Sequence, residues 1–249
     1  MNTRVVVLAA GKGKRMGADL PKPLVEIAGK PIVEHLLSNI IESGVDPLPI
    51  LVISPDATEL FRPICENHRC EFAFQEEQLG TGHATRMAKE LSGDADTIVV
   101  LNGDHPFTSP EVIQELVAMR TEHHAAVSMI TAKVPNYQGD FAAFQSWGRI
   151  KRDTSGNVEK IVEVKDAGEE ELAIKEVNPA LYAFDAHWLW EHLPELQNKN
   201  VSKEYHLTDL IEIAIGEGED VVTAHADPFE VIGINTPEEL ERAERLLGK

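Results

Sequence analysis

The sequence predicts a doubly wound α/β fold with a mostly parallel sheet, and two patterns indicate it. In the first half, short β-branched runs alternate with amphipathic helical patterns, which is typical of a parallel sheet covered by helices on both faces. From about residue 148 the pattern changes to strands separated by short turns, which predicts a smaller antiparallel subdomain. With 249 residues, 43% of them hydrophobic, the chain is long enough to bury the core of such a fold.

The elements of the first half are predicted from continuous apolar runs and from apolar residues spaced three or four positions apart. Pro31 and Pro110 begin two of the helical patterns, where a missing backbone N–H costs no hydrogen bond. The predicted strands are 4–10, 50–54, 71–74, 97–101 and 126–132. The predicted helices between them are 31–43, 57–67, 81–91 and 110–122.

In the second half, a turn over 153–157 separates two strand patterns, and Thr236 caps the start of the last helix with Glu239 three residues later. The predicted strands are 148–152, 158–164, 176–184, 220–224 and 230–234, and the predicted helices are 186–193 and 207–216. We expect one domain over 1–249, with halves at about 1–135 and 136–235 and a C-terminal helix at 236–249.

The composition excludes several classes of protein. A net charge of −19 argues against a nucleic-acid partner, because phosphate backbones require a broad basic surface. No apolar run approaches the roughly 18 residues that span a bilayer, and the first residues do not form a signal peptide, so we expect a cytoplasmic protein without a membrane partner. Cys65 and Cys70 lack CxxC spacing, and the ten histidines match no zinc motif.

A basic, glycine-rich turn follows the first strand. Residues 4–22 contain five cations and one acid, and the turn would lie at the carboxyl edge of the sheet, where such folds bind ligands. Met16 occupies the third glycine position of a dinucleotide fingerprint, and no GK[ST] sequence is present. Pro21 and Pro23 restrict the backbone around Lys22, so its ammonium could meet a phosphate at low entropic cost. The pattern favours a triphosphate site over a solvated basic turn.

Asp104 also follows an apolar strand, at the same edge of the predicted sheet, and Gly103 beside it allows a ligand to approach closely. Mg²⁺ prefers oxygen ligands and often takes only one or two of them from the protein. Asn235 follows another apolar run and could supply a second oxygen. The residue pattern alone leaves two interpretations open, because an Asp at the end of a strand is often a turn former.

Several motifs together carry a family resemblance. Leu-Ala-Ala-Gly-x-Gly-x-Arg-Met at 8–16 is followed by Leu-Pro-Lys-Pro at 20–23, and further blocks occur in a fixed order. These blocks are 74–84, 148–150, 161–167, 176–178, 204–209 and 230–236. They span almost the whole chain, which resembles the sugar-1-phosphate nucleotidyltransferases. Within that family the chain is most similar to the uridylyltransferase domains that act on N-acetylglucosamine 1-phosphate.

The resemblance implies a Mg²⁺-dependent enzyme that transfers a uridylyl group from UTP to a sugar 1-phosphate, with release of pyrophosphate. Arg15 and Lys22 would hold the triphosphate, and Asp104 and Asn235 would bind the metal. The nucleotide contacts implied are Leu8, Ala9, Ala10, Gly11, Gln75, Gly80 and Thr81. The acceptor contacts implied are Asn102, Gly103, Gly148, Glu163, Lys165, Asn178, His206 and Thr208. The first half would then bind the nucleotide and the second half the sugar.

Departures from the family pattern fall on the acceptor side. Asn102 and His206 stand where the family usually has tyrosine, and Pro179-Ala180 replaces a Thr-Gly step. No acetyltransferase β-helix pattern follows residue 235, so we expect no acetyl transfer, and the trimer that such a domain forms is not assumed. The oligomeric state is left open.

Three alternative functions remain. The same chemistry on another base, as guanylyl or thymidylyl transfer, is compatible with the Asn-Gly-Asp sequence at 102–104. A non-catalytic sugar-nucleotide sensor is disfavoured, because it would not need Arg15, Lys22, Asp104 and Asn235 together. A nicotinamide oxidoreductase rests on the fold class alone and lacks the glycine fingerprint.

Overall fold

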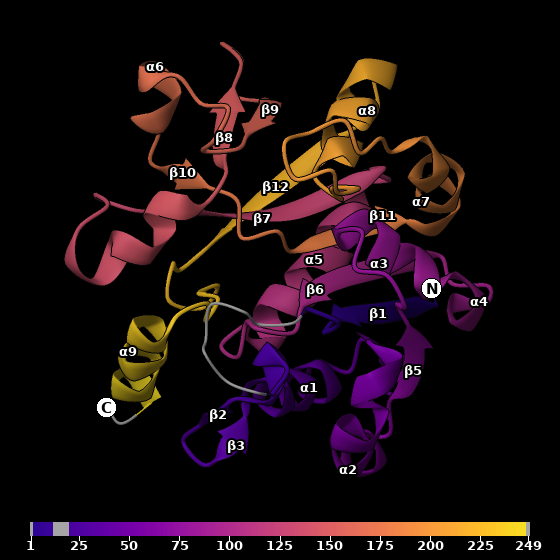
Figure 1. Ribbon diagram of the computed structural model, residues 1–249. Helices are drawn as coiled ribbons and strands as arrows, with labels where there is room; N and C mark the ends of the chain where they lie inside the picture. Colours follow the sequence, from indigo (N-terminus) through magenta and orange to yellow (C-terminus); the bar gives the residue numbers. More distant parts are fainter. Residues whose placement is uncertain (1, 12–19, 248–249) are drawn as a thin grey trace.

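The computed structural model describes residues 2–11 and 20–247, and a mixed sheet forms its centre (Figure 1). Within the described residues this sheet has ten strands, in the order β5-β4-β1-β6-β11-β7-β10-β8-β9, and β12 pairs with β7. The four strands on one side run parallel and are β5 (Glu71–Phe74), β4 (Ile50–Ile53), β1 (Thr3–Leu8) and β6 (Thr97–Asn102). The predicted doubly wound, mostly parallel fold is confirmed.

Alternate residues of the central strands face two layers of helices. On β1, Val5 and Val7 pack against one layer and Val6 against the other, and all three are fully buried. The first layer contains α1 (Ile32–Ser43), α2 (Thr58–His68) and α5 (Pro110–His123). The second contains α3 (Thr81–Met87), α4 (Lys89–Ser92), α7 (Ala186–His192) and α8 (Asp209–Glu217). Burial on both faces explains why these strands read as continuous apolar runs.

The middle of the sheet corrects one strand prediction. The expected strand 176–184 is two separate strands, β10 (Glu176–Val177) and β11 (Tyr182–Asp185). Pro179 has no N–H to donate, and Ala180 has a left-handed φ of +58°, so the residues between the two strands cannot continue a ladder. β11 lies antiparallel between β6 and β7 (Val127–Lys133). The loop before β11 therefore lies beside the end of β6.

The antiparallel subdomain lies at the upper left of Figure 1 and matches the prediction from the sequence. β10 pairs with β7 and with β8 (Arg149–Arg152), and β8 pairs with β9 (Val158–Val162), all in antiparallel directions. α6 (Glu169–Leu172) connects β9 to β10. Short 3-10 segments complete the described chain, namely η2 (Lys22–Leu24), η3 (Pro55–Ala57), η4 (Gly139–Ser146) and η5 (Leu193–Glu195).

The last segments return to the first half of the chain. β12 (Val221–Ala226) runs parallel to β7, but the predicted strand 230–234 is wrong, because this segment pairs with none of the described strands. A turn at 227–230 interrupts it, and the Ile234 N–H donates instead to the backbone carbonyl of Asp104, at 3.0 Å. α9 (Pro237–Leu247) then packs near β2 (Glu26–Ile27), which pairs with β3 (Lys30–Pro31). No helix in the described ranges is both long and apolar enough to cross a membrane.

Candidate active site

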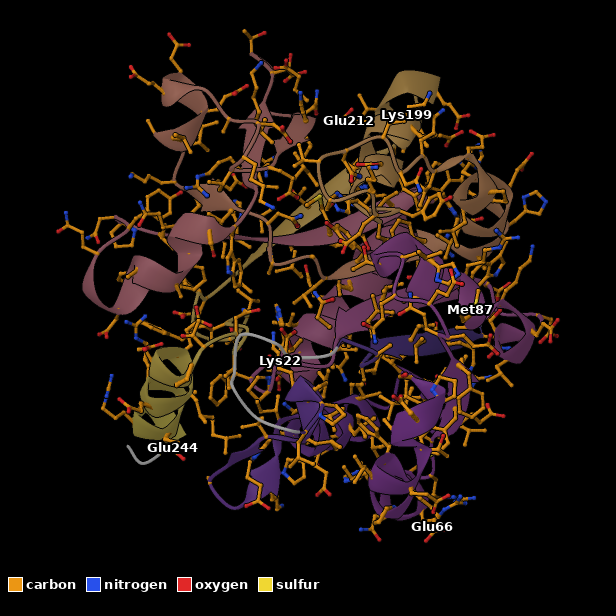
Figure 2. All side chains as sticks on the ribbon, in the orientation of Figure 1. Lys22, Glu66, Met87, Lys199, Glu212 and Glu244 are labelled. Atoms are coloured by element: carbon orange, nitrogen blue, oxygen red, sulfur yellow. The ribbon has the colours of Figure 1, made fainter. Side chains whose placement is uncertain are left out.

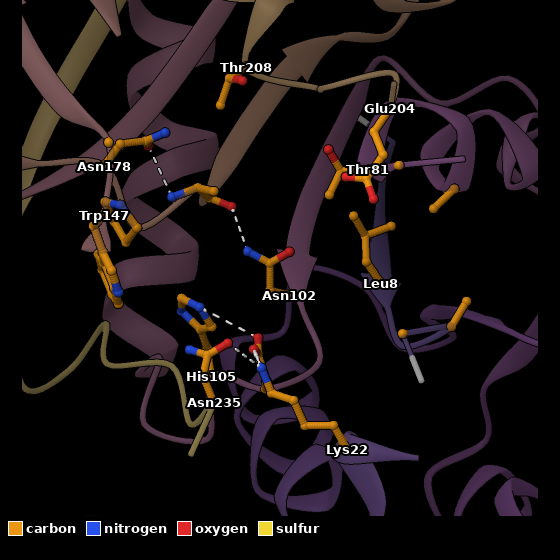
Figure 3. Close-up of a pocket in the computed structure, with 18 of the residues that line it drawn as sticks. Leu8, Lys22, Thr81, Asn102, His105, Trp147, Asn178, Glu204, Thr208 and Asn235 are labelled. Carbon is orange, nitrogen blue, oxygen red and sulfur yellow. Dashed lines mark hydrogen bonds and ion pairs between the residues drawn. The ribbon is translucent and has the colours of Figure 1, made fainter. Parts of the chain in front are cut away.

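A cavity of about 690 Å³ opens at the carboxyl ends of β1 and β6, between the parallel strands and the antiparallel subdomain (Figure 3). Doubly wound folds bind ligands at this edge. Most of the predicted site residues line it, although they come from distant parts of the chain. They are Leu8, Ala10, Gly11, Lys22, Gln75, Gly80, Thr81, Asn102, Asp104, Gly148, Glu163, Asn178, Thr208 and Asn235.

At one end of the cavity, the carboxamide of Gln75 is held in a single orientation. Its Nε2 donates to the Gly80 carbonyl at 3.1 Å and contacts Nδ1 of His83 at 3.0 Å. The nitrogen, rather than the oxygen, must face a carbonyl oxygen, so these contacts use both amide protons. The carboxamide oxygen has no partner among the described residues. Gln75 therefore offers a ligand only a hydrogen-bond acceptor.

Gly80 must be glycine for this arrangement to form. Its φ is +110°, and a Cβ there would lie 2.6 Å from the Tyr205 carbonyl oxygen. Thr81 begins α3, and its hydroxyl accepts the N–H of Leu207 at 2.9 Å. The segment at 205–207 is thereby fixed against the start of α3, which explains why residues far apart in the sequence share one wall of the cavity.

Lys22, Asp104 and Asn235 meet at the end of the cavity that the sequence predicts to bind phosphates, which is called the phosphate end below. The Nζ of Lys22 donates to the Asp104 carboxylate and to the Asn235 Oδ1, the latter at 2.7 Å (Figure 3). The two charged side chains are only 15% and 18% exposed. Figure 2 shows Lys22 in the interior of the view, away from the outer positions of Glu66 and Glu244. The bond from Ile234 to the Asp104 backbone places Asn235 in this cluster.

The pKa of Asp104 lies below its ordinary value. Burial raises the pKa of this carboxyl, but the Lys22 ammonium and the His105 side chain together outweigh that effect. Asp104 is therefore ionised at neutral pH, and its carboxylate is paired with the Lys22 ammonium.

The His105 side chain lines the cavity beside Asp104. The ring is 5% exposed, stacks on Trp147 with centroids 5.9 Å apart, and places Nε2 3.6 Å from the Asp104 carboxylate. A Cβ on Gly233 would lie 2.7 Å from that nitrogen, so glycine allows the ring to fit. Burial lowers the pKa of His105 and favours the neutral ring. The sequence interpretation missed His105 and Trp147, although each is next to a predicted site residue.

A hydrogen-bonded loop crosses the side of the cavity that the sequence predicts to bind the acceptor, which is called the acceptor side below. The Asn102 Nδ2 donates to the Ala180 carbonyl at 3.3 Å, and the Ala180 N–H donates to the Asn178 Oδ1 at 3.0 Å (Figure 3). Asn178 also donates to the Tyr182 hydroxyl at 2.7 Å, and its backbone N–H donates to the Gly148 carbonyl at 2.9 Å. This network joins the end of β6 to the residues that are predicted to contact the sugar, and it stabilises the left-handed conformation of Ala180.

Glu163 is half-buried and unpaired among the described residues. Burial raises the pKa of its carboxyl, and His206 opposes that shift. Glu163 also borders a second cavity of about 390 Å³, which shares Ser146, Glu204 and Thr208 with the first. Lys165 and His206 line only this second cavity, so these two predicted acceptor residues lie behind Glu163.

Two other predicted residues, Ala9 and Gly103, are described by the structure but do not line either cavity. Ala9 is 2% exposed and packs in the core, and Gly103 allows close packing, since a Cβ there would lie 3.0 Å from the Leu8 carbonyl oxygen. Arg15 lies outside the described residues. Gln78 was missed as a site residue, although it is only three positions from Gln75; its Nε2 donates to the Ala10 carbonyl at 2.7 Å.

Residues 5–212 match the model of the MobA-like NTP transferase domain, and the chain belongs to this family. The predicted nucleotidyltransferase class is therefore confirmed. Among curated proteins, the chain is 40% identical over its full length to the bifunctional protein GlmU of Exiguobacterium sibiricum. It is 39% identical over 97% of its length to the bifunctional protein GlmU of Caldicellulosiruptor saccharolyticus. The chain spans about half the length of these relatives, 54% and 51% respectively.

Solved structures share the fold. One is a CMP:2-keto-3-deoxy-manno-octonic acid synthetase complexed with CTP, with a TM-score of 0.72 and 18% identity over 100% of this chain and 99% of that one. Another is a 4-diphosphocytidyl-2C-methyl-D-erythritol synthase from Anaerococcus prevotii, with a TM-score of 0.69 and 17% identity over 99% of this chain and 98% of the other. These matches confirm the nucleotidyltransferase-like architecture.

Proposed function

We propose that this protein transfers a uridylyl group from UTP to a sugar 1-phosphate, with N-acetylglucosamine 1-phosphate as the expected acceptor. The observation that carries the proposal is a single cavity that joins three kinds of groups. Gln75 lies at the nucleotide side, Lys22 with Asp104 at the phosphate end, and Glu163 at the acceptor side. The similarity to the N-terminal part of GlmU-type proteins supports the same assignment.

In the proposed reaction, an oxygen of the sugar phosphate attacks the α-phosphorus of UTP. A new P–O bond forms as the bond from the α-phosphorus to the bridging oxygen breaks, and pyrophosphate leaves with the bonding electrons. A phosphate oxygen is already an adequate nucleophile, so no covalent enzyme intermediate is needed. Lys22 and Arg15 would supply positive charge to the leaving pyrophosphate, and alignment within the cavity would supply much of the rate.

The residues present fit a magnesium ion. Asp104 contributes an ionised carboxylate and Asn235 an amide oxygen, which are ligands of the type that Mg²⁺ prefers. Asp104 and Asn235 both bond the Lys22 ammonium, so an oxygen of each side chain already points toward the same cation. When bound there, Mg²⁺ would neutralise charge on the substrate phosphates. The remaining ligands would come from phosphates and water, as is common for this ion.

Gln75 is compatible with uracil as the base. Its free carboxamide oxygen can accept the N3–H of uracil, whereas cytosine could donate to this oxygen only from its exocyclic amine. At the acceptor side, the unpaired Glu163 carboxylate suits a hydroxyl or amide N–H of the sugar. Asn178 has only part of its hydrogen-bonding capacity left, because it already bonds Ala180 and Tyr182.

Pyrophosphate release across a substrate panel tests the proposed function. UTP, CTP, GTP, ATP and dTTP would each be offered with the 1-phosphates of N-acetylglucosamine, glucosamine, glucose and galactose. We expect the highest kcat/KM with UTP and N-acetylglucosamine 1-phosphate. A higher value with another base would overturn the uridylyl assignment, and a higher value with another sugar would overturn the acceptor assignment. No release with any pair, together with tight binding of a UDP-sugar, would favour the sensor.

A further inference from the structure

Lys22 occupies the place between the two proposed metal ligands. Its ammonium bonds both Asp104 and Asn235, so in the ligand-free protein the oxygens that would hold a metal hold a side-chain cation instead. The contact is largely shielded from water, since the two charged side chains are 15% and 18% exposed. Such a pair is stronger than an ion pair at the open surface.

An ammonium and a divalent cation cannot share this position. Mg²⁺ requires oxygens at about 2.0–2.1 Å, which is closer than any hydrogen bond from a lysine, and the two positive charges would repel each other. A metal can therefore bind Asp104 and Asn235 only after Lys22 has moved away. Lys22 lies on η2 beyond Pro21, and its long flexible side chain can leave while this backbone stays in place.

A triphosphate provides the alternative partner that such a movement needs. Lys22 lines the same cavity as the nucleotide-side residues, so phosphate oxygens bound there would compete with Asp104 for its ammonium. We propose that Lys22 blocks the metal site in the free protein, and that triphosphate binding opens the site by drawing the lysine onto the phosphates. Metal and nucleotide then bind cooperatively, and each raises the affinity of the other.

This inference rests on the proposed assignment of Asp104 and Asn235 as metal ligands, and direct metal binding tests it without turnover. Titration of the nucleotide-free protein with Mn²⁺, followed by the electron paramagnetic resonance of the free ion, would be performed on the wild type and on Lys22→Met. We expect Lys22→Met to bind Mn²⁺ about tenfold more tightly, because its metal ligands are no longer occupied. Lys22→Gln, which also removes the charge, should show the same gain and covers the case in which one variant fails to fold.

Two further variants locate the effect. Lys30→Met removes an exposed lysine of β3 and should leave Mn²⁺ affinity unchanged. Adding Asp104→Asn to Lys22→Met should abolish the gain. Equal affinity in the wild type and both Lys22 variants would overturn the proposal. So would a gain that survives Asp104→Asn, or an equal gain in Lys30→Met, because either would reflect net charge alone. The proposed transfer reaction can fail in the pyrophosphate panel while this metal competition still holds.

Discussion

At the phosphate end of the cavity the charged side chains are paired, whereas at the acceptor end the main carboxylate has no partner among the described residues. Lys22 joins Asp104 and Asn235 in one cluster, and the pKa of Asp104 is lowered. Glu163 is half-buried without such a partner, and its pKa is raised. The charges at the phosphate end are thus paired with one another, and we propose that its ligands rearrange these pairs. The acceptor end is left incomplete, and a ligand would complete it.

The largest effect is expected at the phosphate end. Asp104→Ala should reduce turnover by on the order of a hundredfold or more, as removal of one strong electrostatic group does in other enzymes. Pyrophosphate release with UTP would measure it, and an unchanged melting temperature would show that the protein is folded. Asp56→Ala, at an exposed position that lines neither cavity, is the matched control and should keep near-normal turnover. Near-normal activity of Asp104→Ala would rule out its metal role.

Gln75→Leu tests the nucleotide side of the comparison. It removes the proposed acceptor for the base and leaves the Gly80 carbonyl without its donor, so kcat/KM for UTP should fall about tenfold. The KM for the sugar phosphate should stay the same. Gln138→Leu, at an exposed position, serves as the control. If Gln75→Leu raised only the KM for the acceptor, Gln75 would belong to the sugar side instead.

Asn102→Ala tests whether the network at the acceptor side positions the sugar loop. Loss of the bond to Ala180 should raise the KM for the sugar phosphate about fivefold and leave the KM for UTP unchanged, because a typical hydrogen bond contributes about 1 kcal/mol. Asn39→Ala removes a similar bond, to the Thr108 carbonyl, and should change neither constant. A larger effect on UTP than on the acceptor would show that Asn102 acts at the nucleotide.

The smallest effect is expected for stability at the acceptor end. Glu163→Gln should raise the melting temperature by about 1–3 °C at pH 7, because it removes a half-buried, unpaired charge. The pKa of Glu163 is higher in the folded protein than in the unfolded chain, so the wild type loses stability as pH rises between these values. The advantage of the variant should therefore shrink as pH falls toward 4. Glu170→Gln, exposed on α6, should show no such pH-dependent gain.

Much of the fold can be predicted from the sequence, because the order of apolar and polar residues along a segment reflects which of its faces are buried. The runs of β1 and β6 are apolar at consecutive positions since both faces are covered, and this predicted parallel strands between helices. Where the backbone departs from regular structure, the prediction failed. Pro179 and the left-handed Ala180 interrupt the strand expected over 176–184, and the turn at 227–230 leaves the segment at 230–234 without a strand partner.

For the site, the sequence by itself determined which side chains are candidates for the proposed chemistry. The glycine-rich turn, Lys22 between two prolines and Asp104 after an apolar strand are all legible as residue patterns. Only the tertiary structure decided which hydrogen bonds and ion pairs these side chains form, because each of those bonds joins segments that are distant in the sequence. The hydrogen bond from the Ile234 N–H to the Asp104 carbonyl brings Asn235 close to Asp104 and Lys22. The Gln75 amide nitrogen is held by hydrogen bonds to the Gly80 carbonyl and the His83 ring. No local pattern encodes these contacts between distant segments. They place the Lys22 ammonium between Asp104 and Asn235 at one end of the cavity and leave the Glu163 carboxylate without a partner among the described residues at the other.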